Sequence, residues 1–300
     1  MRRIMIWLKA VRAPFFTATI IPVTLGTIVA YSEQGHIDWF YFWLALIGCI
    51  CLHSGANLLN DYFDHLSRTD VINIEFKRPF TGGSRIIQDG LLSPSTVVKA
   101  GIFFIFLGSM VGIYLVVKID LVILFIGIIG VFSAFFYTAP PLSLVKHGLG
   151  ELFIGLNYGI LMTVGSYVVQ TSRLTLHPVI VSLPISFMIA AILFINEFQD
   201  YTADQKVGKN QLVVRLGKIK AVYGYMILMI CSYISLIAGV LAGILKPACL
   251  LGLFTVPVAA VSIGIVKLFH DENEKLTPAN AMTILNHLLT GLLIIAGYLF

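Results

Sequence analysis

The sequence predicts an all-α integral membrane protein, a bundle of nine transmembrane helices with its N-terminus in the cytosol. Of its 300 residues, 58% are hydrophobic and 12% are charged, half the charged share of an ordinary soluble domain. The mean hydropathy is +0.92, and nine stretches of at least 18 residues contain no Asp, Glu, Lys or Arg. These observations exclude a soluble enzyme, a disordered chain and a nucleic-acid-binding protein, despite an isoelectric point near 9.0.

Each apolar stretch is long enough for one helix, because about 20 apolar residues cross a hydrocarbon core about 30 Å thick. Strands are excluded, because lipid offers no partners for backbone groups and no stretch alternates as a barrel strand does. The nine predicted helices contain residues 13–32, 39–60, 100–117, 121–145, 152–172, 174–196, 221–245, 247–266 and 276–300. The first stretch exceeds a signal-peptide core and lacks a convincing cleavage site, so we expect a retained helix. We expect one domain over residues 1–300.

The distribution of charge predicts the orientation. With nine helices and a cytosolic N-terminus, 17 of the 20 Lys and Arg residues lie on the cytosolic side, as positive residues do in membrane proteins. Only Lys118, Arg173 and Lys246 lie outside. Twelve of the 15 acidic residues are also cytosolic. Acidic residues contribute little to orientation, so this excess indicates a function for carboxylates on the cytosolic face.

Two acidic motifs occupy the cytosolic connections that follow the second and sixth helices. At 100° per residue, the members of each motif share one face of a helix. The first motif contains Asn57, Asp61 and Asp64, and the second contains Asn196, Asp200 and Asp204. Carboxylates on one face repel each other unless a cation lies between them. Mg²⁺ takes one or two carboxylates and completes its shell with phosphate oxygens, so we predict a Mg²⁺-bound diphosphate site with these six residues as ligands.

Basic residues near both motifs are candidates for diphosphate binding, since Arg and Lys both bind phosphate. Positive-inside topology alone would also place bases in these loops, so both interpretations stay open. The candidates are Arg12, Lys77, Arg78, Arg85, Lys206 and Lys209. The four cysteines, Cys49, Cys51, Cys231 and Cys249, fall within predicted helices and indicate neither a disulfide nor a metal site.

At these residues the chain resembles the UbiA superfamily of intramembrane aromatic prenyltransferases. The resemblance rests on Asn60-Asp61-Tyr62-Phe63-Asp64, on Asp200-x-x-x-Asp204, and on the loop Tyr137-Thr-Ala-Pro-Pro141. Asp70 and the stretch from Thr81 to Pro94 are most similar to the 1,4-dihydroxy-2-naphthoate prenyltransferase (MenA) branch. Arg68 stands where the 4-hydroxybenzoate branch usually has a further Asp.

The resemblance implies Mg²⁺-dependent transfer of a polyprenyl group from its diphosphate to an aromatic acceptor, most similar to the step in menaquinone biosynthesis. Asp61, Asp64, Asp200 and Asp204 would be the catalytic acids, and Tyr62, Tyr137 and Tyr201 would line the substrate pocket. The implied partners are the two substrates and the lipid bilayer, with no nucleic acid and no obligate protein partner.

Two alternatives stay open. The acceptor could be 4-hydroxybenzoate, another quinone precursor, or a glycerol or sugar phosphate. A transporter for an anionic lipid is the second alternative, but transporters place their polar residues near mid-membrane. Here the charged residues lie at the helix ends, which favours catalysis at the membrane surface.

Overall fold

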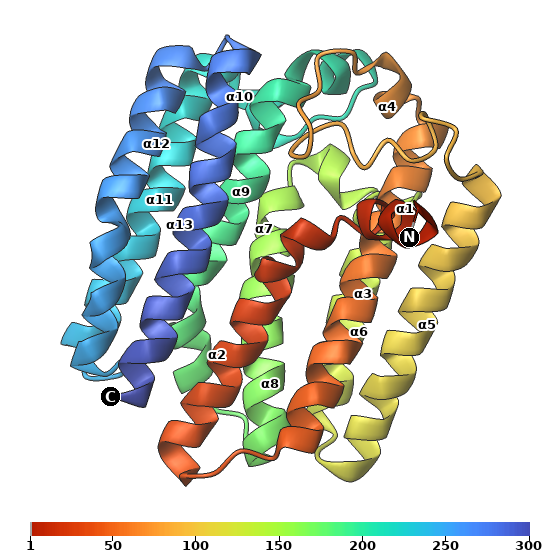
Figure 1. Cartoon of the computed structure of the whole chain (residues 1–300). Coiled ribbons are helices and arrows are strands. Elements are labelled where there is room, and N and C mark those ends of the chain that lie inside the picture. Colours follow the sequence, from red (N-terminus) through yellow and green to blue (C-terminus); the bar gives the residue numbers. More distant parts are fainter. Residues whose placement is uncertain (1) are drawn as a thin grey trace.

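The computed structural model describes residues 2–300, and this part of the chain folds into helices and loops without strands (Figure 1). Eight helical segments are long and apolar enough to cross a membrane. They are η1 (Ala13–Phe16) with α2 (Thr17–Gln34), α3 (Trp39–Leu66), α5 (Pro94–Lys118), α7 (Gly150–Ile154) with η3 (Gly155–Leu161) and α8 (Met162–Thr171), α9 (His177–Lys206), α11 (Lys218–Leu241), η4 (Pro247–Thr255) with α12 (Val256–Phe269), and α13 (Asn273–Leu299). The all-helical membrane fold is therefore confirmed.

The helix predicted over 121–145 is the exception. Here α6 (Val122–Phe136) has 15 residues, or about 22 Å at 1.5 Å per residue, which is less than the core of a bilayer. The chain turns after Phe136 because Pro140 and Pro141 lack the N–H groups that a helix needs. Among the described residues, eight helical segments are long enough to cross a membrane and α6 is a shorter apolar helix, so nine complete crossings stay a prediction.

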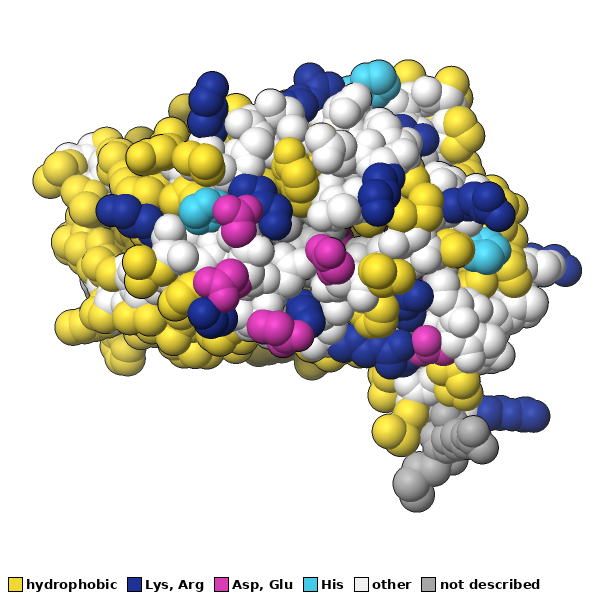
Figure 2. All heavy atoms as spheres, turned by 90° about the horizontal axis from the view of Figure 1, so that it is seen from above, with side chains coloured by type: hydrophobic (Ala, Val, Ile, Leu, Met, Phe, Trp, Pro, Cys, Tyr) yellow, Lys and Arg dark blue, Asp and Glu magenta, His cyan; other side chains and the backbone are white. Residues whose placement is uncertain are grey.

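The two ends of the bundle differ in charge and in structure. Four short helices follow or precede the long ones on one side. They are α1 (Arg2–Ala10), α4 (Thr69–Ile72), η2 (Leu144–His147) and α10 (Leu212–Leu216). Seen from above, this end gathers Lys, Arg, Asp and Glu side chains, and apolar side chains surround it (Figure 2). Lys118 ends α5 at the opposite end, where Arg173 and Lys246 lie in the connections, as the charge analysis expects.

Close contacts between helices depend on small residues. A Cβ atom at Gly55 of α3 would lie 2.9 Å from the carbonyl oxygen of Gly101 in α5. A Cβ atom at Gly108 would lie equally close to the carbonyl oxygen of Gly48. Only glycine allows this separation, which lets two membrane helices pack backbone to backbone. Helix α9 packs against α11 and α13 on one side and against η3 on the other, so it joins the two halves of the bundle.

Candidate active site

Both acidic motifs lie within the last turns of long helices. Asp61 and Asp64 belong to α3, and Asp200 and Asp204 belong to α9. The predicted place of the motifs in the connections after the helices is therefore wrong, whereas the predicted common helical face agrees with the structure. The helices continue through them because their apolar residues, such as Leu58 and Phe198, are fully buried and hold the final turns against the bundle.

The two motifs face each other across one cavity of about 300 Å³. Its polar end is lined by Arg12, Asn57, Asn60, Asp64, Asp70, Asn73, Asn196, Glu197, Asp200, Asp204, Lys209 and Gln211. Residues 139 positions apart in the chain, Asn57 and Asn196, thus border the same space. The juxtaposition of the motifs that the sequence predicts is present in the structure.

Lys209 bridges the motifs. Its Nζ atom lies 3.3 Å from Asp64 Oδ2 and 3.8 Å from Asp204 Oδ1. Burial alone would lower the pKa of Lys209, but the negative charges of Asp64 and Asp204 outweigh burial and raise the pKa. Lys209 is therefore a permanent cation between the two acidic helices.

The loop after the first motif reaches the second motif. Asn73 Nδ2 donates a 2.6 Å hydrogen bond to Asp200 Oδ1, and Gln211 donates to Asp204 Oδ2 from the other side. Asn280 of α13 donates to Asn196 Oδ1 at 2.8 Å. These contacts fix the orientation of the second motif. The sequence analysis missed all three donors, since an isolated Asn or Gln carries no spacing signal.

Asp61 occupies a different position from the other acids. It is only 2% exposed, it pairs with the guanidinium of Arg12, and it accepts hydrogen bonds from the backbone and hydroxyl of Ser84. A Cβ atom at Gly83, where φ is +70°, would lie 2.8 Å from Asp61 Oδ1. Glycine is required at this close approach. Asp61 therefore lies behind the cavity wall and holds Arg12 in place.

Asp70 takes a place in the wall that the sequence analysis did not assign to it. Asp70 lines the cavity, and its carboxylate lies 3.1 Å from the position of a Cβ atom at Gly83. Burial raises the pKa of Asp70 well above its usual range, and the negative charges of Asp64 and Asp61 raise it further. The only signal in the sequence was its similarity to the MenA branch.

Of the six predicted diphosphate-binding bases, Arg12 and Lys209 line the cavity. Arg78 pairs with Asp89 at 2.8 Å, and Lys77 pairs with Glu274 at the surface. Arg85 donates to the carbonyl oxygens of Asp70 and Asn73, so it holds the loop. Lys206 is exposed. Charge attraction to nearby acids, which a linear sequence does not reveal, directs Lys77 and Arg78 away from the cavity.

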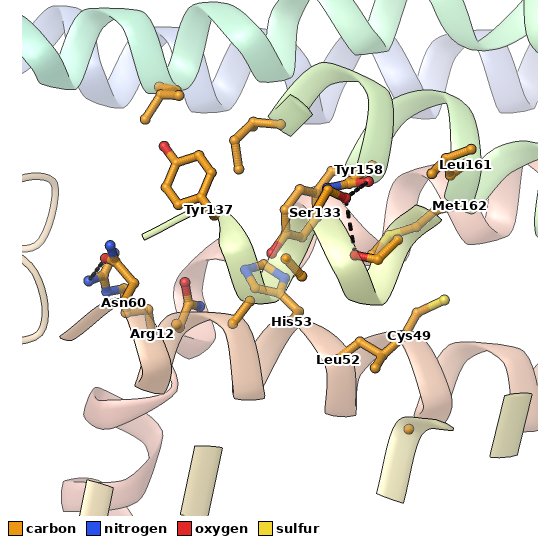
Figure 3. A pocket seen from close by; sticks show the side chains of 18 of the residues that line it. Arg12, Cys49, Leu52, His53, Asn60, Ser133, Tyr137, Tyr158, Leu161 and Met162 are labelled. Carbon is orange, nitrogen blue, oxygen red and sulfur yellow. Dashed lines mark hydrogen bonds between the residues drawn. The ribbon is translucent and has the colours of Figure 1, made fainter. Parts of the chain in front are cut away.

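Of the three predicted pocket tyrosines, Tyr137 lines the cavity (Figure 3). Tyr62 packs against the apolar cluster around α1 and α3, and Tyr201 packs between α9 and its neighbours with Lys218 over its ring. Tyr62 and Tyr201 lie outside the cavity because helical geometry points them away from the faces that carry Asp64 and Asp200.

Away from the acids, the cavity continues as an apolar groove between α3, α5, α6 and α8. Small residues form much of its wall, including Gly48, Gly112, Gly127, Gly130 and Gly165. Between α7 and α8 the chain forms a π-helix, η3, which brings Asn157 and Tyr158 to the wall. Such π segments are frequent at functional sites.

The donor set fits Mg²⁺. Among the described residues, no group of three or more Asp, Glu, His or Cys side chains converges on a single ion, and Mg²⁺ needs only one or two carboxylates when phosphate oxygens supply the rest. Asp204 Oδ1 is buried without a hydrogen-bond partner among these residues. The side-chain oxygen of Asn57 is also available, because its amide nitrogen donates to the carbonyl of Val11.

Comparison with known proteins agrees with this geometry. The chain is 28% identical over 296 residues to UbiA prenyltransferase domain-containing protein 1 of Xenopus tropicalis, covering 97% of this chain and 81% of that protein. It is 26% identical over 244 residues to 1,4-dihydroxy-2-naphthoate octaprenyltransferase of Bacillus subtilis, covering 80% and 75%. It is 27% identical over 293 residues to 2-carboxy-1,4-naphthoquinone phytyltransferase of Synechocystis, covering 98% and 92%.

Solved structures share the fold. A UbiA homologue from Archaeoglobus fulgidus bound to DMAPP and Mg²⁺ matches with a TM-score of 0.61 at 15% identity, covering 97% of this chain and 99% of that one. A digeranylgeranylglyceryl phosphate synthase matches with a TM-score of 0.63 at 19% identity, covering 99% of both. The sequence profile of the UbiA prenyltransferase family matches residues 19–289. With nine-tenths of its length matched and both acidic motifs on one cavity, the chain belongs to the UbiA prenyltransferase family.

Proposed function

We propose that this prenyltransferase moves a polyprenyl group from its diphosphate to 1,4-dihydroxy-2-naphthoate, with Mg²⁺ as the cofactor. The observation that carries the proposal is the main cavity, acidic at one end and apolar along the rest, that the two motifs share. Relatives named as naphthoate and naphthoquinone prenyltransferases support the acceptor. A fold neighbour bound to a prenyl diphosphate and Mg²⁺ supports the donor and the cofactor.

Asp64, Asp200 and Asp204 would hold the ion together with Asn57 and Asn196, and Asp61 would act with them through Arg12. When bound, Mg²⁺ supplies the positive charge that stabilises the departing diphosphate. Lys209 and Arg12, the two cationic side chains that line the cavity, would bind its remaining oxygens. The apolar groove between α3, α5, α6 and α8 would hold the prenyl tail.

In the reaction, the bond between the allylic carbon and the diphosphate oxygen breaks, and its electron pair leaves with the diphosphate. An electron-rich ring carbon then forms a bond to the allylic carbon, and with a naphthoate acceptor the ring loses its carboxylate as CO₂. Water must be excluded because it would quench the cationic carbon. The enclosed groove provides this shelter, and Tyr137 and Tyr158 provide aromatic faces for positive charge.

We also propose that the acidic end faces the cytosol, because 17 of the 20 Lys and Arg residues lie on that side. A glycerol phosphate acceptor is the second candidate, since the digeranylgeranylglyceryl phosphate synthase shares the fold.

The test uses the purified chain in detergent or lipid with geranylgeranyl diphosphate. 1,4-Dihydroxy-2-naphthoate, 4-hydroxybenzoate and a glycerol phosphate are supplied in parallel, each with Mg²⁺ and with EDTA, and products are identified by mass. We expect a prenylated naphthoquinol that lacks the carboxylate, formed only with Mg²⁺. Diphosphate release with no prenylated naphthoquinol would overturn the acceptor, and turnover in EDTA would overturn the cofactor.

A further inference from the structure

A second, smaller cavity adjoins the first. Its volume is about 130 Å³, less than half the 300 Å³ of the main cavity. It lies between η1 and α2 on one side and α9 and α13 on the other, with walls that include Phe15, Ala18, Ile189, Ile192 and Ile284. The prenyl groove lies among α3, α5, α6 and α8, so the two spaces extend in different directions.

The two cavities meet beside the acidic motifs. Both are bordered by Arg12, His53, Asn57, Tyr158 and Asn196. Figure 3 shows His53 and Tyr158 between Arg12 and Asn60 on one side and Cys49 and Leu52 on the other. A molecule in the second cavity would therefore reach the diphosphate end of the prenyl donor without entering the groove of the tail.

His53 lies at this junction with a fixed orientation. Its side chain is 6% exposed, and its Nδ1 atom is 2.7 Å from Thr19 Oγ1. The Tyr158 ring packs edge-on at 4.6 Å between centroids, and the Phe16 ring at 5.3 Å. Among the described residues, His53 Nε2 has no hydrogen-bond partner, while the opposite ring nitrogen is held. With Nδ1 held by Thr19, the free Nε2 atom of His53 can exchange a hydrogen bond with a hydroxyl group.

The charge of the second cavity indicates the class of its ligand. Arg12 is the only cationic side chain in its wall among the described residues, and Arg12 is already bonded to Asp61 and Asn60. Most of the other wall residues are apolar. A phosphate-bearing polyol would therefore lack cations, whereas a flat hydroxylated ring would match both the apolar walls and the open Nε2 atom of His53.

We propose that the second cavity holds the aromatic acceptor and that His53 selects it through a hydrogen bond between Nε2 and a ring hydroxyl. This inference rests on the proposed prenyl transfer and adds to it the place of the acceptor and the residue that recognises it. Thr19 is a positioning residue, because it acts on the acceptor only through His53.

The test measures binding and turnover separately on the full chain. 1-Hydroxy-2-naphthoate is the probe for binding, measured by titration calorimetry in detergent. His53→Leu is expected to weaken its binding about tenfold, the loss of about one net hydrogen bond. His53→Gln, which keeps a polar group, should lose less affinity for the probe than His53→Leu. The affinity of Thr19→Val should lie between those of wild type and His53→Leu.

A steric variant tests the cavity without changing His53. Ala18→Leu fills the second cavity and should raise the KM of the acceptor, with the KM of the prenyl diphosphate unchanged. Ala238→Leu, the same substitution at an exposed position of α11 outside both cavities, is the matched control and should leave the acceptor KM unchanged.

The outcomes separate the inference from the proposed function. If wild type prenylates no aromatic acceptor, the proposed function fails, while the binding titrations still report on the cavity. If Ala18→Leu and His53→Leu change the KM or the preferred length of the prenyl diphosphate and leave probe binding unchanged, the second cavity holds the tail and the inference is overturned. Equal probe binding by wild type and His53→Leu would also overturn it.

Discussion

Asn73 donates a 2.6 Å hydrogen bond to Asp200, and this contact joins the loop after the first acidic motif to the second motif. The donor lies in the chain between α4 and α5, whereas the acceptor lies in α9. Folding of the loop therefore sets the orientation of a carboxylate on a distant helix. This relationship assigns the loop a role in building the site.

Asn73→Ala should reduce turnover about 10- to 100-fold, the usual effect of removing a group that orients a metal ligand. The Mg²⁺ concentration for half-maximal rate should rise, because Asp200 loses its orientation. A Mg²⁺ titration of initial rates measures both effects. Asn210→Ala is the control, since the Asn210 side chain is exposed outside the cavity. An unchanged Mg²⁺ titration in Asn73→Ala would contradict the orienting role.

Asp61→Asn and Asp200→Asn should both abolish turnover but differ in stability. Asp61 pairs with Arg12 in a buried site, and removing one member of such a pair costs about 3 kcal/mol. Asp200 has no cationic partner among the described residues, so its variant should unfold near the wild-type temperature. Thermal unfolding in detergent, with product assays in parallel, measures both. Retained turnover in either variant would contradict the assignment of the acids.

Lys209→Met should raise the KM of the prenyl diphosphate at least about tenfold, because a charged hydrogen bond contributes about 1.5–3 kcal/mol. Arg78→Ala and Lys206→Ala should change this KM less than about twofold, as expected for exposed charges outside the cavity. Steady-state kinetics at fixed acceptor concentration compares the three variants. A rise with Lys206→Ala as large as that with Lys209→Met would show that the exposed base enters the site during turnover.

Asp70→Asn should stabilise the protein in EDTA at pH 7 and weaken its activity. A carboxyl whose pKa is higher in the folded state than in the unfolded state costs folding free energy when it ionises. The contribution of Asp70 to stability therefore falls as pH rises from its usual pKa of 3.8 to its raised value. Unfolding temperatures of wild type and Asp70→Asn between pH 4 and pH 8 test this. The difference between the two temperatures should increase with pH. A constant difference would contradict the raised pKa.

Gly127→Leu should shift the enzyme toward shorter prenyl diphosphates. A Cβ atom at this position meets nothing within 4 Å, and the residue lines the prenyl groove, so the larger side chain should enter the groove without disturbing the helix. Rates with geranyl, farnesyl and geranylgeranyl diphosphate measure the preference. Gly264→Leu is the control, because Gly264 is equally open but lies in α12 outside the groove. The same shift in both variants would contradict the position of the tail.

The sequence by itself determined the membrane class, the approximate extent of the long helices, the two acidic motifs and the family. Each can be read from a local pattern. The length of an apolar stretch indicates whether a helix can span the membrane, and a spacing of three or four residues places side chains on one helical face. Tyr62 and Tyr201, next to the acids in sequence, show the limit of this reasoning, because adjacent helical residues point to different faces.

Only the tertiary structure decided which neighbours of the motifs reach the cavity. Lys209 enters it, whereas Arg78 is drawn to Asp89 and Lys77 to Glu274. Asp70 lines the wall, and Asp61 is held behind it by Arg12 and Ser84. These outcomes depend on contacts between residues tens to hundreds of positions apart, where charge pairing and burial select one arrangement. The position of His53 beside the second cavity also depends on tertiary structure, because Thr19, Tyr158 and α9 meet only in the folded bundle.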